Sequence, residues 1–289
     1  EEVFENIWVQ PAAGDAGGAL GAALSVWYLY YSKERLLSKA RDYMKGSYLG
    51  PSYKTNQIES ELNACGAIYT ILDNESLLEK VVLELQKKKT IGWMQGRMEF
   101  GPRALGARSI IADPRSSNMQ KKLNLKIKFR ESFRPFAPSI LCSEVNNWFD
   151  FKKDSPYMTF VAEVKNKKRL LVSQKEDMLF GIEKLNIPRS LVPAVTHVDY
   201  SARIQTVHKD TNPKYHELLS NFFIKTGCPI LINTSFNVRG EPIVCTATDA
   251  FKCFMGTGLD ILVIDNFILY KNDQSINLQK NYSNNYELD

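Results

Sequence analysis

The stretch TIGWMQGRMEFGPRALGARSI, Thr90–Ile110, joins two unlike kinds of sequence. Its first residues are apolar and predict a short buried strand. From Gly96 onward it carries Arg97, Arg103 and Arg108 among three glycines and a proline, a composition too rich in glycine for an ordinary helix. We therefore expect a strand that enters a loop. Guanidinium groups spaced along such a loop are typical of anion binding.

The positive charge of the chain is concentrated around this loop. Between Arg97 and Arg134 there are six Arg and four Lys against three acidic residues, a balance of +7, whereas the whole chain of 289 residues carries +5. The remainder is therefore about −2 (5 minus 7). The five cysteines are scattered without any CxxC pair, which favours reduced thiols in a cytoplasmic protein. The longest nearly apolar run, Ala19 to Tyr31, is too short to span a bilayer.

Before Thr90 the sequence predicts helices. PAAGDAGG is a glycine turn, a helix is expected from Ala19 to Met44, and GSYLGPSY, residues 46–53, reads as a linker. Two more helices are expected, near Lys54–Ala64 and from Glu75 to about Lys88, the latter with Asn74 as N-cap.

After Thr90 short strands alternate with loops. Asn212 with Pro213 begins a helix that Gly227 ends, another helix is expected around Asp249–Met255, and the chain closes with a hairpin turning at Asp265-Asn266. Strands are expected within the segments TIGWMQG, FRPFAPSILC, YMTFVAEVK, SARIQTVHK and PILINTSFN. These mixed elements indicate an α/β (α+β) fold.

A second basic segment, KIKFRESFRPF, holds Lys126, Lys128, Arg130 and Arg134. On an extended backbone alternate residues share a face, so the first three would point the same way. A solvated basic surface or generic nucleic-acid contact is the alternative. The phenylalanines of this segment have core-like spacing rather than the interleaving of RNA-binding proteins. A small polyphosphate ligand is favoured.

The loop NTSFNVRGEP, Asn233–Pro242, follows a predicted strand and offers hydroxyl, amide and backbone donors to a nucleotide, although a simple capped turn would look alike. His197 is expected to be structural rather than catalytic. Asp15 lies in the glycine turn, and its position suits a metal ligand or an N-cap equally well. No histidine pair has metal-ligand spacing.

These segments together resemble the O-carbamoyltransferases of the nodulation-protein and antibiotic-tailoring type. The resemblance runs from PAAGDAGGALGAAL to GLDILVIDNFIL and is strongest in GWMQGRMEFGPRALGARSI, FRPFAPSIL, ARIQTV and LINTSFNVRGEPIV. It implies an N-terminal domain of the sugar-kinase/actin ATPase (ASKHA, Kae1-like) superfold and a C-terminal domain like the threonylcarbamoyl-adenylate synthases (YrdC-like), an open twisted mixed sheet with flanking helices. By this resemblance we expect residues 1–46 to be a remnant of the first domain, 47–272 the second, and 273–289 a polar tail.

The resemblance also implies a chemistry. Carbamoyl phosphate and ATP, with Mg²⁺, would give a carbamoyl adenylate and pyrophosphate, and the carbamoyl group would pass to a hydroxyl of a sugar or natural product. Arg97, Arg103 and Arg108 are expected at the phosphates as the catalytic group. The residues expected to bind substrate or nucleotide are Lys128, Arg130, Arg134, Arg203, Ser235 and Asn237.

The sequence departs from the family pattern near its N-terminus. Family members carry a histidine pair that helps to bind a divalent metal (Fe, Mn or Zn), and Asp15 matches their aspartate ligand without those partners. The chain begins at Glu1 without Met, and we expect a fragment that retains the adenylation half and needs the missing N-terminal domain for acceptor transfer. Rival interpretations are a threonylcarbamoyl-adenylate synthase of tRNA modification, a hydrogenase-maturation carbamoyltransferase and a non-catalytic nucleotide- or RNA-binding module. We expect no membrane partner, and nucleic acid is disfavoured.

Overall fold

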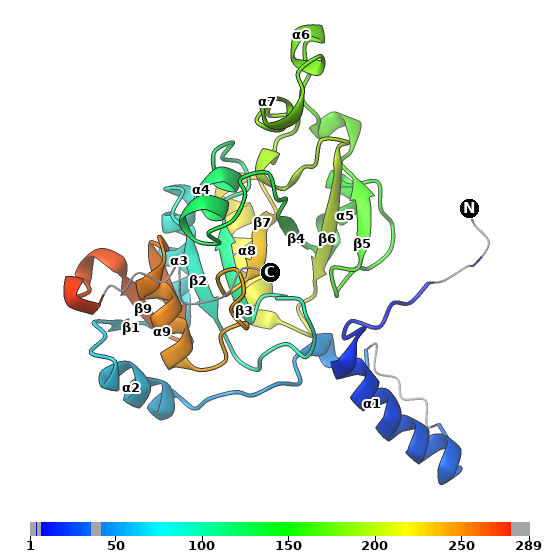
Figure 1. Cartoon of the computed structure of the whole chain (residues 1–289), viewed down its shortest axis with the longest axis vertical. Helices are drawn as coiled ribbons and strands as arrows, with labels where there is room; N and C mark the ends of the chain where they lie inside the picture. Colours follow the sequence, from blue (N-terminus) through cyan, green and yellow to red (C-terminus); the bar gives the residue numbers. More distant parts are fainter. Residues whose placement is uncertain (1–3, 5–6, 36–41, 279–289) are drawn as a thin grey trace.

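A computed structural model of the chain describes residues 4, 7–35 and 42–278 (Figure 1). A nine-stranded mixed sheet runs through it in the order β1-β9-β8-β2-β3-β7-β4-β6-β5. Most neighbours are antiparallel, but β2 is parallel to β8 and β4 is parallel to β6. The strands are β1 (Thr70–Ile71), β2 (Ile91–Met94), β3 (Arg108–Ala112), β4 (Ala137–Leu141), β5 (Phe160–Glu163), β6 (Ser201–Val207), β7 (Ile230–Ser235), β8 (Ile261–Ile264) and β9 (Phe267–Tyr270).

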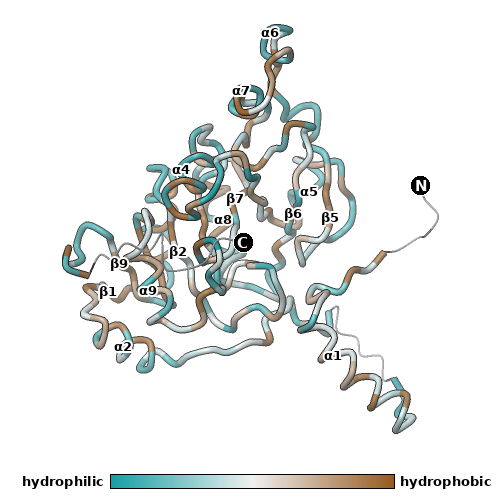
Figure 2. The backbone as a smooth tube through the Cα atoms, in the orientation of Figure 1, coloured by the Kyte–Doolittle hydropathy of each residue, from teal (hydrophilic) through white to brown (hydrophobic). Residues whose placement is uncertain are grey.

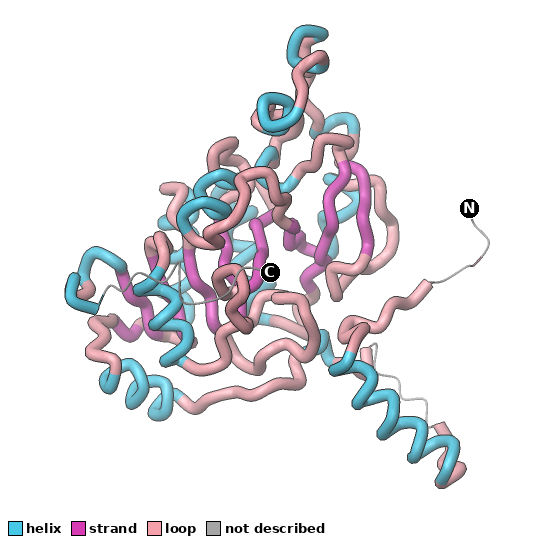
Figure 3. Tube along the Cα trace, viewed as in Figure 1, coloured by secondary structure: helices cyan, strands magenta, loops and turns pink. Residues whose placement is uncertain are grey.

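The predicted α/β class, a mixed sheet with flanking helices, is confirmed. Figure 3 shows the strands side by side with helices around them, and Figure 1 shows α4 and α9 in front of the sheet with α3 and α8 behind it. The flanking helices are α2 (Thr55–Ala64), α3 (Asn74–Gln86), α4 (Met119–Lys126), α8 (Pro213–Thr226) and α9 (Ala247–Gly256). Shorter helices are α5 (Val145–Trp148), α6 (Gln174–Asp177) and α7 (Gly181–Leu185).

Local signals set the ends of α8 as predicted. The Asn212 side chain accepts a hydrogen bond from the backbone N–H of Tyr215, and Gly227 has the left-handed conformation (φ 70°) that closes a helix. The N-cap of α3, however, is Asp73 rather than Asn74, because the Asp73 carboxylate accepts from the Ser76 N–H at 2.9 Å.

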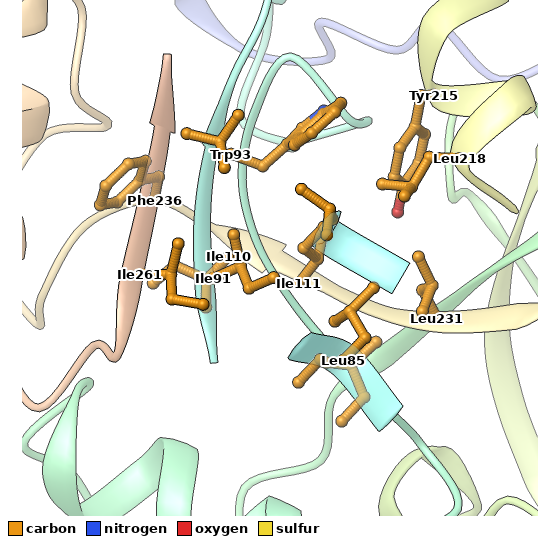
Figure 4. Packing of buried hydrophobic residues seen from close by; sticks show 14 of the residues in the cluster. Leu85, Ile91, Trp93, Ile110, Ile111, Tyr215, Leu218, Leu231, Phe236 and Ile261 are labelled. Carbon is orange, nitrogen blue, oxygen red and sulfur yellow. The ribbon is translucent and has the colours of Figure 1, made fainter. Parts of the chain in front are cut away.

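The core lies between the sheet and the helices on its faces. Trp93, Tyr215, Phe236 and their neighbours are fully buried there and come from β2, α8 and the loop after β7 (Figure 4). Continuous burial of β2, β3, β4 and β8 fits central strands that are covered on both faces. Such a core holds the ends of these strands at fixed positions.

The first helix lies apart from this core, although Pro11 and Ala12 just before it are buried beside Gly101. α1 (Asp15–Ser25) continues as a π-helical turn, Val26–Tyr30, and neither contains a buried residue. Figure 1 shows α1 projecting from the body, and Figure 2 shows apolar residues along it. The predicted helix from Ala19 to Met44 is wrong in its second half, since Ser32 is left-handed (φ 49°), which interrupts helical geometry. Residues 36–41 of that prediction lie outside the described residues.

Further predictions concern the C-terminal tail, the division into domains and membrane-spanning helices. Most of the predicted polar tail, from residue 279 onward, lies outside the described residues, and the three-part division of the chain remains a prediction. Over the part of the chain that the structure describes, no helix has both the length and the apolar character needed to cross a bilayer.

Candidate anion-binding site

Two cavities meet at the end of β7. The smaller, about 150 Å³, and the larger, about 450 Å³, share Arg130 and Ser235 in their walls. The smaller cavity is lined by Pro102, Arg103, Ala104, Arg130, Pro135, Phe136, Ala137, Met158, Arg203, Asn233, Thr234 and Ser235. The larger is lined by Lys128, Arg130, Arg134, Ser235, Asn237, Val238, Arg239, Gly240, Glu241 and Pro242. Seven of the ten residues predicted for ligand or metal binding are therefore brought together here.

The smaller cavity is strongly cationic. The pKa of Arg203 is lowered by burial and by the charge of neighbouring Arg103, and burial also lowers the pKa of Arg130, to about 10. Among the described residues, no Asp or Glu lines this cavity. Cations held close together without a carboxylate between them repel one another, and a bound anion relieves that repulsion.

Lys128 joins the basic segment to the β7 loop. Its Nζ donates to the carbonyl oxygens of Ser235 (2.5 Å) and Asn237 (2.9 Å), and lies 2.7 Å from Asn237 Oδ1 and 3.1 Å from Ser235 Oγ. Burial lowers the pKa of Lys128 to about 7, whereas the surrounding oxygens favour its charged form. Lys128 therefore fixes the shape of the loop.

The predicted extended face of this basic segment is wrong. Residues up to Lys126 belong to helix α4, and Phe129 is left-handed (φ 48°), so alternate residues do not point the same way. Lys126 is exposed and lines neither cavity, whereas Lys128 is 3% exposed. The turn at Phe129 instead brings Arg130 to the shared wall.

Arg130 is held in place by two neighbours. Its Nε donates to Asn124 Oδ1 at 2.8 Å, and its guanidinium lies 5.1 Å from the centre of the Phe136 ring. Two arginines that line the larger cavity pair with the Glu131 carboxylate, Arg134 at 3.1 Å and Arg239 at 3.4 Å. Ion pairs that are partly exposed to water are weak, so an incoming polyanion can compete for both arginines.

Arg97, Arg103 and Arg108, which the sequence places in one loop, have different surroundings in the structure. Arg103 is exposed at the smaller cavity. Arg97 donates to the carbonyl oxygen of Leu49 at 3.2 Å, away from both cavities. Arg108 is fully buried on β3, and its guanidinium binds the carbonyl oxygens of Gln95, Gly96 and Ala107. Arg97 and Arg108 therefore contact protein backbone rather than the cavities.

A buried carboxylate holds the loop that ends in Arg108. Glu99 Oε1 accepts from the N–H groups of Leu105 (2.7 Å), Ala107 (2.8 Å) and Arg108 (3.3 Å). Burial raises the pKa of Glu99, and these hydrogen bonds act in the opposite direction. Gly106 has φ 106°, and a Cβ there would meet the ring of Tyr215 at 2.3 Å, so only glycine fits. The loop therefore has a fixed shape next to Arg103.

The predicted linker, residues 46–53, packs against the same loop. Ser47 is 1% exposed and its Oγ donates to the carbonyl oxygen of Phe100, while the Tyr48 hydroxyl donates to that of Leu105 at 2.8 Å. Two residues of the predicted linker, Ser47 and Tyr48, therefore pack against the buried loop and supply hydrogen bonds to it.

The remaining candidates lie elsewhere. His197 hydrogen-bonds Ser201 Oγ at 3.1 Å, in agreement with a structural role. Asp15 is exposed at the first residue of α1, where Gly14 is the N-cap, so the N-cap interpretation of Asp15 is wrong. Over the residues that the structure describes, no group of three or more His, Cys, Asp or Glu side chains could hold a metal ion. The described residues do not provide a metal site around Asp15.

Comparison with known proteins identifies the family. Residues 82–271 match the family model of the carbamoyltransferase C-terminus. The chain belongs to this family.

Among curated relatives, an uncharacterized protein of Synechocystis is 56% identical over 292 residues, which cover 100% of this chain and 47% of that protein. Nodulation protein NolNO of Sinorhizobium fredii is 40% identical, over 94% of this chain and 37% of that protein. The 3'-hydroxymethylcephem-O-carbamoyltransferase of Amycolatopsis lactamdurans is 28% identical, over 90% of this chain and 43% of that enzyme. The chain thus spans about half or less of these relatives, and the predicted family resemblance is confirmed.

The sequence-based prediction did not include Glu99 or Arg239, and it named Asn233 only as part of the polar loop that could bind a nucleotide. Arg239 stands inside the quoted NTSFNVRGEP loop, so its proximity to the predicted ligands was a usable signal. Glu99 gave none, because a single acid in a basic stretch reads as solvated surface until its burial is known.

Proposed function

We propose that the chain is the carbamoyl-activating part of an ATP-dependent O-carbamoyltransferase. It binds carbamoyl phosphate and ATP–Mg²⁺ and forms carbamoyl adenylate, whose carbamoyl group passes to a hydroxyl of a sugar or natural product. The family supports carbamoyl transfer. The single observation that carries the adenylation step is the pair of adjoining cationic cavities that share Arg130 and Ser235.

The sizes of the cavities suggest how the ligands divide. Carbamoyl phosphate suits the smaller cavity, where Arg103, Arg130 and Arg203 meet its phosphate. The triphosphate suits the larger one, where Lys128, Arg130, Arg134 and Arg239 supply cations and the loop after β7 supplies backbone groups. Arg130 then contacts both ligands and brings their reacting atoms together.

The reaction balances when water takes part. Water cleaves carbamoyl phosphate to carbamate and phosphate. A carbamate oxygen then forms a bond to the α-phosphorus of ATP while the bond from that phosphorus to the bridging oxygen of pyrophosphate breaks. Negative charge shifts onto the leaving pyrophosphate, and fixed guanidinium groups stabilise it without rearrangement. The anionic carbamate also stays near cations rather than in bulk water, where it is easily lost.

The acceptor step belongs to the longer protein. There the acceptor hydroxyl oxygen attacks the carbamoyl carbon, AMP leaves and the hydroxyl proton is lost. The cephem relative is named for a hydroxymethyl acceptor, which is the same class of group. A divalent metal is part of this proposal only for the full-length protein, and no step here uses one. The substrates and the five free thiols support a cytoplasmic location.

Calorimetric titration tests this proposal. Carbamoyl phosphate and an ATP analogue with a non-cleavable α–β bridge are each titrated alone, and then each into protein saturated with the other. We expect both to bind at the same time, with one site each. Mutual exclusion would contradict adjoining subsites, and binding of RNA with no binding of either small ligand would favour the nucleic-acid-binding alternative.

A further inference from the structure

The smaller cavity is also lined by Asn233, a polar side chain to which the proposed phosphate contacts give no role. Asn233 is 1% exposed, lies on β7 two residues before Ser235, and lines the cavity with Arg103, Arg130 and Arg203. Alternate residues of a strand share a face, so Asn233 and Ser235 point to the same side of the sheet.

The orientation of the Asn233 amide is fixed by its neighbours. Its Nδ2 donates to the carbonyl oxygen of Ala104 at 3.1 Å and to Gln205 Oε1 at 2.8 Å. Gln205 is itself fixed, because its Nε2 donates to the carbonyl oxygen of Leu105 at 2.7 Å and its Oε1 accepts from Ser139 Oγ at 2.5 Å. Backbone carbonyl oxygens only accept hydrogen bonds, so neither amide can be flipped.

One hydrogen-bond acceptor of this network, Asn233 Oδ1, has no donor in the described part of the chain. Both N–H groups of Asn233 are used, and its Oδ1 is buried with no hydrogen-bond partner among the described residues. A buried acceptor without a donor is unfavourable, and because Asn233 lines the cavity, a donor on a bound ligand would satisfy it. The arginines cannot recognise such a donor, because a guanidinium group carries no acceptor.

We propose that Asn233 Oδ1 accepts a hydrogen bond from the N–H₂ of the carbamoyl group and thereby selects an amide-bearing acyl phosphate. This rests on the proposed function. Acetyl phosphate has nearly the same shape and the same anion, but a methyl group replaces the N–H₂. A methyl group placed at Oδ1 leaves the acceptor unpaired and excludes the water that could serve it, so the site rejects the isostere.

The wild-type chain provides the first test. Carbamoyl phosphate, acetyl phosphate and inorganic phosphate are titrated separately by calorimetry. We expect carbamoyl phosphate to bind on the order of 10- to 100-fold more tightly than acetyl phosphate, the range for one buried unpaired group. Equal affinities would overturn the role of Asn233 while leaving phosphate binding, and with it the proposed function, intact. Failure of all three to bind would contradict the proposed function itself.

Two variants localise the effect. Asn233→Ala should bring the ratio of the affinities for carbamoyl phosphate and acetyl phosphate close to one, even if loss of the hydrogen bond to Ala104 lowers both affinities. Ser139→Ala removes another hydrogen bond of the same network and should keep the wild-type ratio, because Asn233 Oδ1 is unchanged. A ratio that survives in Asn233→Ala would contradict the proposal. Thermal melts show whether each variant is folded, and if Asn233→Ala is not, the wild-type comparison decides.

Discussion

The loop Gly96–Arg108 and the segment Lys128–Arg134 are both basic, yet they use their cations in opposite ways. In the first, Arg97 and Arg108 bind backbone carbonyl oxygens and only Arg103 reaches a cavity. In the second, Lys128, Arg130 and Arg134 all line the larger cavity. Cations therefore bind protein oxygens in the first segment and line a cavity in the second, and Lys128, which is 3% exposed, does both.

The largest expected effect is on Arg130, which borders both cavities. Arg130→Ala should lower the affinity for carbamoyl phosphate and the affinity for ATP, each by about 100-fold, because both ligands lose a charge-assisted contact in a partly buried site. Calorimetry of each ligand measures this. Arg115→Ala is the matched control, because Arg115 pairs with Asp113 and lines neither cavity. If Arg130→Ala weakened the binding of only one ligand, Arg130 would not contact both, which would contradict a shared wall.

Arg108 should behave as a structural residue. Arg108→Met leaves the buried carbonyl oxygens of Gln95 and Ala107 without this donor and removes the cation beside Glu99, so the free energy of unfolding should fall by about 3 kcal/mol. Urea unfolding measures the change. Affinity of the remaining folded protein should change little. A stable Arg108→Met variant that no longer binds phosphate would instead place Arg108 among the ligand contacts.

Arg103 and Arg97 form a matched pair from one loop. Arg103→Ala should weaken carbamoyl phosphate by about 10-fold and change stability by less than about 0.5 kcal/mol, because Arg103 is exposed and lines the cavity. Arg97→Ala removes the same charge and should change the affinity by less than about twofold, since Arg97 donates to the Leu49 carbonyl oxygen and lines neither cavity. Equal effects would mean that net charge alone attracts the ligand.

Lys128 gives the smallest effect, a dependence on pH. Its pKa of about 7 means that the amine is mostly neutral at pH 8, and a bound polyanion raises that pKa, so ATP binding should take up a proton at pH 8 and none from Lys128 at pH 5.5. Affinity should accordingly fall as pH rises above 7. Calorimetry in buffers of different ionisation enthalpy measures the uptake. The Lys128→Met variant lacks the amine, so its uptake reports the ligand's own titration, and the difference between the two proteins is the contribution of Lys128. No difference between the two proteins would show that Lys128 is charged throughout.

Local signals predicted much of the fold. The caps of α8 and the hairpin at Asp265-Asn266 depend on only a few neighbouring residues, so they are visible in the sequence. Strand β3 was not predicted, since its residues read as the end of the arginine loop.

Features that depend on distant contacts could not be predicted in this way. The burial of Arg108 depends on carbonyl oxygens that the loop presents only after folding. Residues Ser47 and Tyr48 likewise meet the Phe100 and Leu105 carbonyl oxygens only in the folded chain. The turn at Phe129 has a positive φ at a residue that rarely adopts one, so an extended segment was the natural expectation. Seven predicted site residues nevertheless meet at the two cavities, because their motifs flank strands that are neighbours in the sheet.

The central claim is that carbamate and ATP react across the wall formed by Arg130 and Ser235. Exchange of labelled pyrophosphate into ATP tests it most directly. The account predicts exchange that requires carbamoyl phosphate, does not occur with acetyl phosphate, and is lost in Arg130→Ala but kept in Arg115→Ala. Exchange that proceeds equally well without carbamoyl phosphate, or its absence in a folded chain that binds both ligands, would contradict adenylation at this site.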